Sequence, residues 1–304
     1  MSVKATVLSS LLALSKKIYR SLRHEVCLSW QFISGDISAS IVPGLLFMMA
    51  AWKTHPTNAV DFLMVLGRGI VYFWLYIVPF CISNQIVGIE EDRINKPHRP
   101  LVKGSVSLLG AKVRLVVSMV LFGLVGWWFG VLEWALLWQG CIFLHNLGSG
   151  SKHWITKNLF MGVGALAQLA AAWQLVTPIT SIAWQWILVV AGVWLFLAAI
   201  QDLRDIDGDR AIGRNTFPIA FGETTSRVVL TSGFGLLPFV IHFALMVPAG
   251  LTWNVILCDI VLAVISFTIA ARIVSFRLPK ADHYSYMLFT YWFCSVLVCA
   301  IAVI

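Results

Sequence analysis

The chain has 304 residues, of which 59% are hydrophobic and only 12% carry a charge. Soluble domains carry about 25% charged residues, so this composition excludes a soluble enzyme, a disordered chain and a disulfide-stapled secreted domain. The net charge of +8, from 22 Lys and Arg against 14 Asp and Glu, is typical of basic cytoplasmic loops in membrane proteins. We therefore expect an integral, multi-pass protein of the lipid bilayer that binds no nucleic acid, and nothing in the sequence predicts a protein partner.

Apolar runs of about 20 residues, long enough to cross a bilayer, recur along the whole chain. They predict one all-α domain over residues 1–304, a membrane bundle of about nine transmembrane helices. Within residues 1–25, basic side chains follow a short apolar run, which favours a helix lying on the cytoplasmic membrane surface over a cleaved signal. The predicted spans are residues 27–50, 60–87, 106–127, 129–147, 158–176, 182–203, 228–248, 252–272 and 285–304.

Basic residues assign the two sides of the membrane. They gather in alternate loops, such as 93–103 and 204–214, whereas the opposite loops hold essentially only Lys53. This bias predicts a cytoplasmic N-terminus, and an odd number of helices then places Ile304 on the far side.

Seven of the 14 acidic residues lie in two short stretches, each at the cytoplasmic end of a predicted helix. Carboxylates at a helix C-terminus oppose the helix dipole, so another positive charge must compensate them. Two matched clusters at one membrane face predict a divalent-cation site; the alternative is that they only pair with nearby Arg and Lys. The first stretch contains Glu90, Glu91 and Asp92, and the second contains Asp202, Asp205, Asp207 and Asp209.

The spacing of these residues sharpens the prediction. Asp202, Asp205 and Asp209 fall at i, i+3 and i+7, along one stripe of a helix. Asn84, Gly88 and Asp92 would form the corresponding stripe on the second predicted helix. Two facing stripes of oxygen ligands can hold Mg²⁺, with water and a substrate phosphate completing its coordination.

Basic residues follow both clusters and suit a diphosphate bridged to the metal. Arg93, Lys96 and Arg99 follow the first cluster, and Arg210 and Arg214 follow the second. The alternative is that they anchor helix ends at the anionic inner leaflet.

These residues resemble the two motifs of the UbiA superfamily of intramembrane prenyltransferases. Asn84–Pro97 is similar to the first, Asn/Asp-rich motif, and Asp202–Arg210 followed by Gly213–Pro218 is similar to the second. The order and separation of the motifs and the chain length also fit. The resemblance implies a helical bundle around a central cavity, in which the motifs bind Mg²⁺ and the diphosphate of a prenyl substrate.

One position departs from the prenyltransferase pattern. Gly88 stands where an Asp is usual, and this loss resembles the fungal branch of membrane terpene cyclases of the bergamotene-synthase type. That resemblance implies a class I terpene cyclase in the endoplasmic reticulum that ionises farnesyl diphosphate and closes the carbocation to a sesquiterpene. Two alternatives stay open: transfer of a prenyl group to an aromatic acceptor, and transport of a cation or metabolite.

The expected site residues follow from the motifs and from helical spacing. The cavity lining is expected to include Phe73, Tyr76 and Phe80, one to three turns before Asn84, and Trp194, before Asp202; packed or lipid-facing rings are the alternative. His145 is expected to make a helix–helix hydrogen bond, with a terminating base as the alternative. The metal is expected on Asn84, Glu91, Asp92, Asp202, Asp205 and Asp209. The diphosphate is expected on Arg93, Lys96, Arg99, Lys157, Asn158, Arg210 and Arg214.

Overall fold

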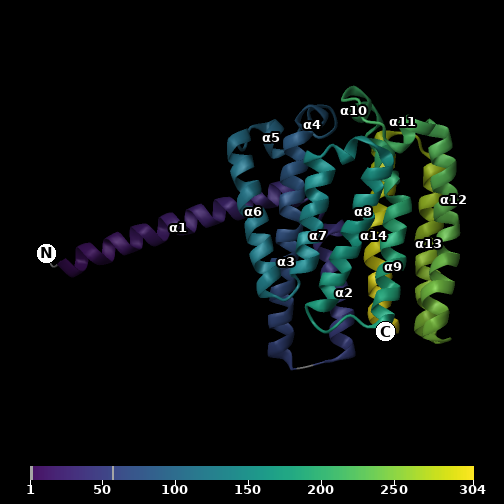
Figure 1. The fold of residues 1–304 in the computed structure, drawn as a ribbon, viewed down its shortest axis with the longest axis horizontal. Helices are drawn as coiled ribbons and strands as arrows, with labels where there is room; N and C mark the ends of the chain where they lie inside the picture. The colour runs from purple at the N-terminus through teal and green to yellow at the C-terminus, as the bar shows by residue number, and fades with distance from the viewer. Residues whose placement is uncertain (1–2, 57) are drawn as a thin grey trace.

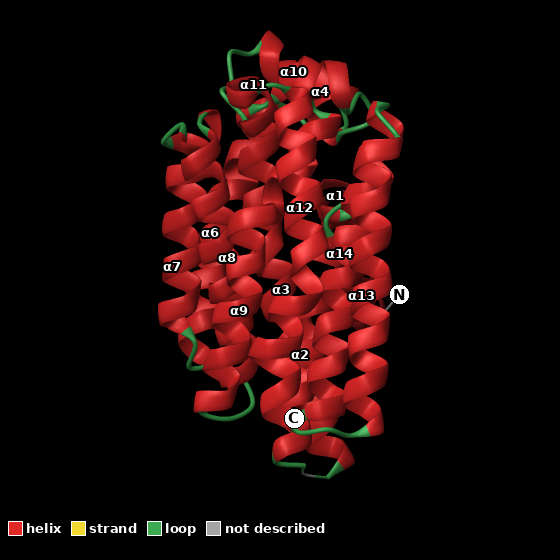
Figure 2. Ribbon diagram, turned by 90° about the vertical axis from the view of Figure 1, so that its right-hand side faces the viewer, coloured by secondary structure: helices red, strands yellow, loops and turns green. Residues whose placement is uncertain are grey.

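The computed structural model describes residues 3–56 and 58–304, and within them every regular element is helical (Figure 2). The prediction of an all-α membrane bundle is confirmed. The long helices stand side by side, except for α1, which projects sideways from the bundle (Figure 1). They are α1 (Val3–Ile33), α2 (Ile41–Thr54), α3 (Ala59–Val87), α6 (Leu108–Trp128), α7 (Leu132–Ile142), α8 (Trp154–Gln174), α9 (Ser181–Leu197), α12 (Glu223–Ile241), α13 (Trp253–Ser275) and α14 (Pro279–Val303).

Seven helical stretches in the described part of the chain are long and apolar enough to cross a membrane. The structure therefore does not by itself reach the predicted count of nine. Two further helices run through the bundle: α8, which carries the polar Lys157 and Gln168, and the short α7 with the π-helical turn Phe143–Leu147 that follows it. The seven stretches are Ile37–Thr54, Ala59–Val87, Leu108–Trp128, Ser181–Arg204, Glu223–Ala249, Trp253–Ser275 and Pro279–Val303.

The helix predicted over residues 27–50 is interrupted. Helix α1 runs without a break from the predicted surface segment to Ile33, a short 3-10 turn follows at Ile37–Ala39, and α2 begins at Ile41. The interruption falls at Ser34, Gly35 and Asp36, residue types that favour turns over helix interiors. It places Asp36 at the junction of the two helices.

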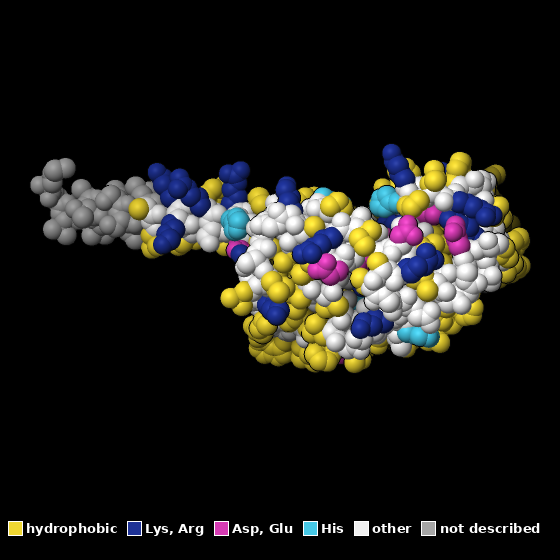
Figure 3. All heavy atoms as spheres, turned by 90° about the horizontal axis from the view of Figure 1, so that it is seen from above, with side chains coloured by type: hydrophobic (Ala, Val, Ile, Leu, Met, Phe, Trp, Pro, Cys, Tyr) yellow, Lys and Arg dark blue, Asp and Glu magenta, His cyan; other side chains and the backbone are white. Residues whose placement is uncertain are grey.

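Four short helices gather at one end of the bundle, opposite the C-terminus (Figure 1). Seen from this end, acidic and basic side chains are spread over the face (Figure 3). Gly208 lets two of these helices approach closely, because a Cβ atom there would force the Asn95 side chain to move. The short helices are α4 (Ile89–Asn95), α5 (Pro100–Lys103), α10 (Ile206–Ala211) and α11 (Phe217–Phe221).

Candidate active site

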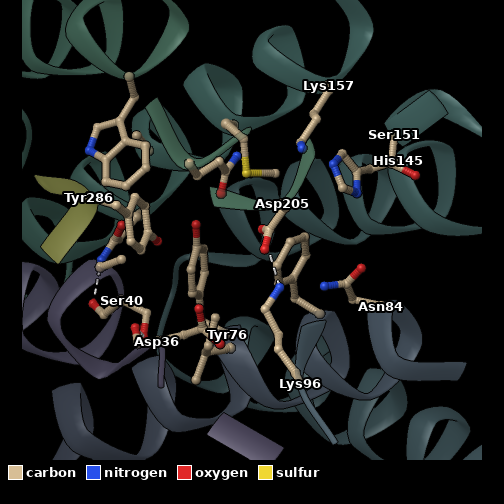
Figure 4. Close-up of a pocket in the computed structure, with 18 of the residues that line it drawn as sticks. Asp36, Ser40, Tyr76, Asn84, Lys96, His145, Ser151, Lys157, Asp205 and Tyr286 are labelled. Atoms are coloured by element: carbon tan, nitrogen blue, oxygen red, sulfur yellow. Dashed lines mark hydrogen bonds and ion pairs between the residues drawn. The ribbon is translucent and has the colours of Figure 1, made fainter. Parts of the chain in front are cut away.

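A cavity lies inside the bundle near the end where the short helices gather (Figure 4). Five basic side chains line the part of the cavity nearest the short helices, which we call the charged head. Each of them comes from a different segment of the chain. Lys96 ends α4, Arg99 precedes α5, Lys157 is in the first turn of α8, Arg204 ends the 3-10 turn Ala198–Arg204, and Arg214 lies between α10 and α11. The fold thus concentrates positive charge that is dispersed in the sequence.

Carboxylates offset these cations, beginning with Asp205 in the cavity lining. Its Oδ2 atom lies 3.3 Å from both Lys96 Nζ and Arg204 Nε. Burial alone would raise the pKa of Asp205, but these two cations hold it below its ordinary value. Asp205 therefore stays ionised at neutral pH.

Arg214 connects the two acidic stretches. Its Nη1 atom lies 2.5 Å from Glu91 Oε2 in α4 and 3.0 Å from Asp209 Oδ1 in α10. Burial raises the pKa of Glu91 above its ordinary value, although Arg214 acts in the opposite direction. The clusters predicted to face each other are thus brought together, with an arginine between them.

Three predicted metal ligands are not part of the cavity lining but pair with basic residues that are. Asp92 accepts from Arg99 Nη1 at 2.8 and 2.9 Å, and Asp202 accepts from Lys157 Nζ at 2.5 Å. Asp209, held by Arg214, is the third, and all three are buried. Asp202 and Asp209 do not share a helical stripe, because Asp202 belongs to the 3-10 turn and Asp209 to α10.

The remaining predicted residues divide by position. Asn84 lines the cavity, together with the predicted aromatic residues Tyr76, Phe80 and Trp194. The other four lie outside its lining. Arg93 and Arg210 are exposed and pair with the exposed Glu90 and Asp207; Asn158 is buried; Phe73 packs in the core against Tyr72 and Tyr76.

Aromatic rings form the deeper wall of the cavity. Trp138 stacks on Tyr76 with ring centroids 4.8 Å apart and on Phe80 at 5.3 Å, and its Nε1 donates to Tyr76 O. Tyr76 precedes Asn84 by eight residues on α3, about 12 Å along the helix. The cavity therefore passes from a charged head to an apolar, aromatic depth.

Several lining residues were not predicted from the sequence. Arg204 lies inside the second acidic stretch, so its place between Asp202 and Asp205 was a usable signal. Tyr286 from α14 lies against Arg204, with the guanidinium carbon 4.3 Å from the ring centroid. Trp138 and Tyr286 reach the cavity only through tertiary packing, and no motif marks them.

Two buried carboxylate oxygens are left without a hydrogen-bond donor, Asp202 Oδ2 and Asp209 Oδ2. Oxygen atoms of this kind are the ligands that Mg²⁺ prefers, so the residues present fit the predicted ion. Among the described residues, no three His, Cys, Asp or Glu side chains are grouped closely enough to hold a metal alone. Any ion here would need further oxygens from water or substrate, as is usual for Mg²⁺.

The fold and the cavity define a class of protein: a polytopic helical membrane protein with a charged head and an aromatic pocket inside one bundle. The chain belongs to the UbiA prenyltransferase family, whose model matches residues 40–294. This confirms the resemblance drawn from the two motifs. Because members of this group are enzymes, the transport interpretation is left without support.

Individual relatives cover nearly the whole chain. A somaliensene A/B synthase of Streptomyces somaliensis is 43% identical, over 91% of this chain and 93% of that protein. A polyprenyl transferase of Hericium erinaceus is 33% identical, over 92% and 96%. A UbiA homologue of Archaeoglobus fulgidus, solved bound to GPP and Mg²⁺, has the same fold, with a TM-score of 0.64 and 12% identity, over 91% of this chain and 100% of that chain.

Proposed function

We propose that the protein is a Mg²⁺-dependent class I terpene cyclase, which ionises a prenyl diphosphate and closes the resulting carbocation into a cyclic product. One observation carries this proposal: five cations at the head of a cavity whose depth is lined with aromatic rings. The head is complementary to a diphosphate, and the depth to a hydrocarbon chain that carries a passing positive charge. Farnesyl diphosphate is the substrate class that we would test first.

The five lining cations are the proposed diphosphate ligands. Arg99, Lys157 and Arg214 are each held by a buried carboxylate, so little conformational entropy is lost when they meet the substrate. Preorganised positive charge of this kind stabilises the negative charge that develops on a leaving diphosphate. Arg93 and Arg210 are left out of this set because both side chains are exposed.

Asp202 and Asp209 are the proposed primary metal ligands, because each has one unpartnered buried oxygen. Asn84 and Asp205, in the cavity lining, and Glu91 and Asp92 supply the other candidate oxygens. Held by these residues, Mg²⁺ would supply positive charge that stabilises the leaving diphosphate. A UbiA homologue that shares this fold was solved bound to GPP and Mg²⁺, which supports the proposal of a Mg²⁺ site.

The aromatic wall has two proposed tasks. Tyr76, Phe80 and Trp138 present ring faces that stabilise a nearby cation. Their apolar surface also excludes water, which would quench the carbocation to an alcohol. Trp194, which packs against Phe289 and Phe293, closes the pocket from α9.

Prenyl transfer to an aromatic acceptor is the second candidate function. The 33% identity to a polyprenyl transferase favours it, whereas the 43% identity to a somaliensene A/B synthase favours the cyclase. The two reactions share ionisation of the diphosphate and differ in whether a second substrate enters. Gly88 lacks the carboxylate of the Asp that is usual in prenyltransferases, and this loss further favours the cyclase.

The protein is an integral, multi-pass membrane protein, and we propose that the head of the cavity faces the cytoplasm. The support is the basic bias of the loops at this end and the single basic residue, Lys53, in the opposite loops. The endoplasmic reticulum stays a prediction from the fungal resemblance alone, because a bacterial relative is 43% identical.

The test is turnover without an acceptor. Membranes containing the protein are incubated with farnesyl diphosphate and Mg²⁺, and the organic extract is analysed by gas chromatography–mass spectrometry. A cyclic hydrocarbon that disappears with EDTA is the expected result. No product from farnesyl or longer prenyl diphosphates, but product when an aromatic acceptor is added, would overturn the cyclase in favour of the transferase.

A further inference from the structure

His145 is a buried histidine in the cavity lining that the diphosphate and metal assignments do not use. It lies in the π-helical turn after α7, and such turns in α-helices are frequent at functional sites. Its ring lies near Phe80 and Phe160, with centroids 5.6 and 6.2 Å away, and points into the cavity beside Lys157 and Asn84 (Figure 4). It therefore stands where the charged head meets the aromatic wall.

A chain of hydrogen bonds determines which nitrogen of His145 carries the proton. The Ser83 hydroxyl donates its only proton to Phe80 O, at 3.0 Å, so Ser83 Oγ accepts from Asn146 Nδ2, at 2.6 Å. Asn146 must then present its carbonyl oxygen to His145 Nδ1, 2.7 Å away. Nδ1 is therefore the protonated nitrogen, and in the neutral ring Nε2 has a free lone pair.

His145 Nε2 is buried and has no hydrogen-bond partner. Two cations, Lys157 and Arg214, line the same cavity, and positive charge near an imidazole favours its neutral form. An unpaired acceptor in a buried site costs free energy unless a ligand or a reaction uses it.

Three other candidate bases of the lining already have partners. Glu91 and Asp205 are bound in ion pairs, and the Tyr76 hydroxyl donates to Gly164 O. Asp36, half-buried at the junction of α1 and α2, accepts from the Cys81 thiol at 3.4 Å. Because a thiol is only a weak hydrogen-bond donor, Asp36 is the main alternative to His145 as the base.

We propose that His145 Nε2 is the base that ends the cyclisation, an inference that rests on the proposed function. A C–H bond next to the cationic carbon breaks, its electron pair becomes the new C=C bond, and the proton moves to Nε2. The balanced reaction releases a cyclic hydrocarbon, diphosphate and one proton, which the imidazolium passes on when the products leave. Asn146 is a positioning residue that holds the ring in the reactive tautomer.

The test separates ionisation from proton removal in His145→Gln and His145→Asn. Diphosphate release and hydrocarbon products are both measured, with the prenyl diphosphate that the wild type consumes. Because positioned bases accelerate proton transfer by about 10²–10⁴-fold, we expect the native hydrocarbon share of the products to fall at least about tenfold. Alcohols or other alkenes replace it, while diphosphate release stays within about threefold. His242→Gln, a histidine paired with Asp259 away from this cavity, is the matched control.

Different outcomes overturn different statements. A wild type that releases no diphosphate without an acceptor overturns the proposed cyclase function, and the His145 inference with it. An active wild type whose His145 variants keep the native product spectrum overturns the inference alone. A product shift in Asp36→Asn that is absent from the His145 variants also overturns the inference. The same holds if the His145 variants lose diphosphate release although they elute as folded protein on gel filtration.

Discussion

Arg214 Nη1 lies 2.5 Å from Glu91 Oε2, and this contact joins the two acidic motifs, which are more than a hundred residues apart in the sequence. Removing one partner of a buried ion pair costs about 3–5 kcal/mol, because the charges left behind stay unpaired. We expect Arg214→Gln to lower the thermal stability of the purified protein and to abolish diphosphate release. Thermal unfolding in detergent and a diphosphate assay measure the two effects.

Arg210→Gln is the matched control for that change. The sequence predicts both Arg210 and Arg214 as diphosphate ligands, but the Arg210 side chain is 67% exposed, against 8% for Arg214. An exposed ion pair contributes about 0–1 kcal/mol, so this variant should behave as the wild type. Equal loss of turnover in both variants would contradict the placement of the diphosphate at the cavity head.

The carboxylates of the two motifs should be essential for turnover. Asp92→Ala and Asp205→Ala each free a cation of the cavity head, Arg99 or Lys96, and remove a candidate metal ligand. We expect turnover to fall by at least about 10²–10³-fold, the effect of removing one preorganised electrostatic group. Membrane insertion should stay intact, as judged by the amount of protein in the membrane fraction. Asp207→Ala, with an 82% exposed side chain, is the control, and full activity in both motif variants would contradict the site.

The two cavity acids Asp205 and Glu91 should have opposite effects on stability as the pH changes. The pKa of Asp205 is lowered in the folded protein, so its contribution to stability is present above the ordinary aspartate pKa and lost as the pH falls through the folded value. The pKa of Glu91 is raised, mainly by burial, so its contribution is present at low pH and lost as the pH rises through the folded value.

Thermal unfolding measured across acidic and neutral pH tests this difference. Relative to wild type, Asp205→Asn should lose the most stability near neutral pH and little in acid. Glu91→Gln should lose less near neutral pH than Asp205→Asn does. The same pH profile for both variants would show that their environments do not differ as the contacts indicate.

Substitution of an aromatic residue in the cavity lining should change the products, whereas substitution of one outside the lining should change only stability. Trp194 lines the cavity, whereas Phe73 is fully buried in the core and does not. We expect Trp194→Leu to change the ratio of products, because a ring that faces the carbocation is lost. Phe73→Leu should lower stability by about 1–3 kcal/mol and leave that ratio unchanged. Chromatography of the organic extract and thermal unfolding give the two readouts.

Much of the bundle could be predicted from hydropathy alone, because a run of about 20 apolar residues has few other places to lie. The break at Ser34–Asp36 and the length of α1 were not predicted. The predicted span of residues 27–50 was drawn through this turn, although the local preferences of Ser, Gly and Asp mark a break there. The change of winding in the 3-10 turn before Asp205 was missed for a similar reason, since spacing arguments assume a regular α-helix.

The motifs predicted which stretches meet, but not which side chain of each stretch faces inward. Lys96 and Arg93 lie three residues apart in the same motif, yet Lys96 pairs with Asp205 and Arg93 with the exposed Glu90. The difference arises because Arg93 lies inside α4, whereas α4 ends at Asn95 and Lys96 has a non-helical backbone (φ −142°, ψ 60°), so the two side chains do not share one helix face. The tautomer of His145 depends on residues of α3, and no local pattern in the sequence encodes that contact.

The C-terminus lies at the end of the bundle opposite the short helices (Figure 1). A reporter fused after Ile304 would therefore sit across the membrane from the mouth of the cavity, without touching the residues that line it. Protease or dye access to that reporter in sealed vesicles would reveal which compartment delivers the substrate, because the side that labels the tag is the side that the active site does not face.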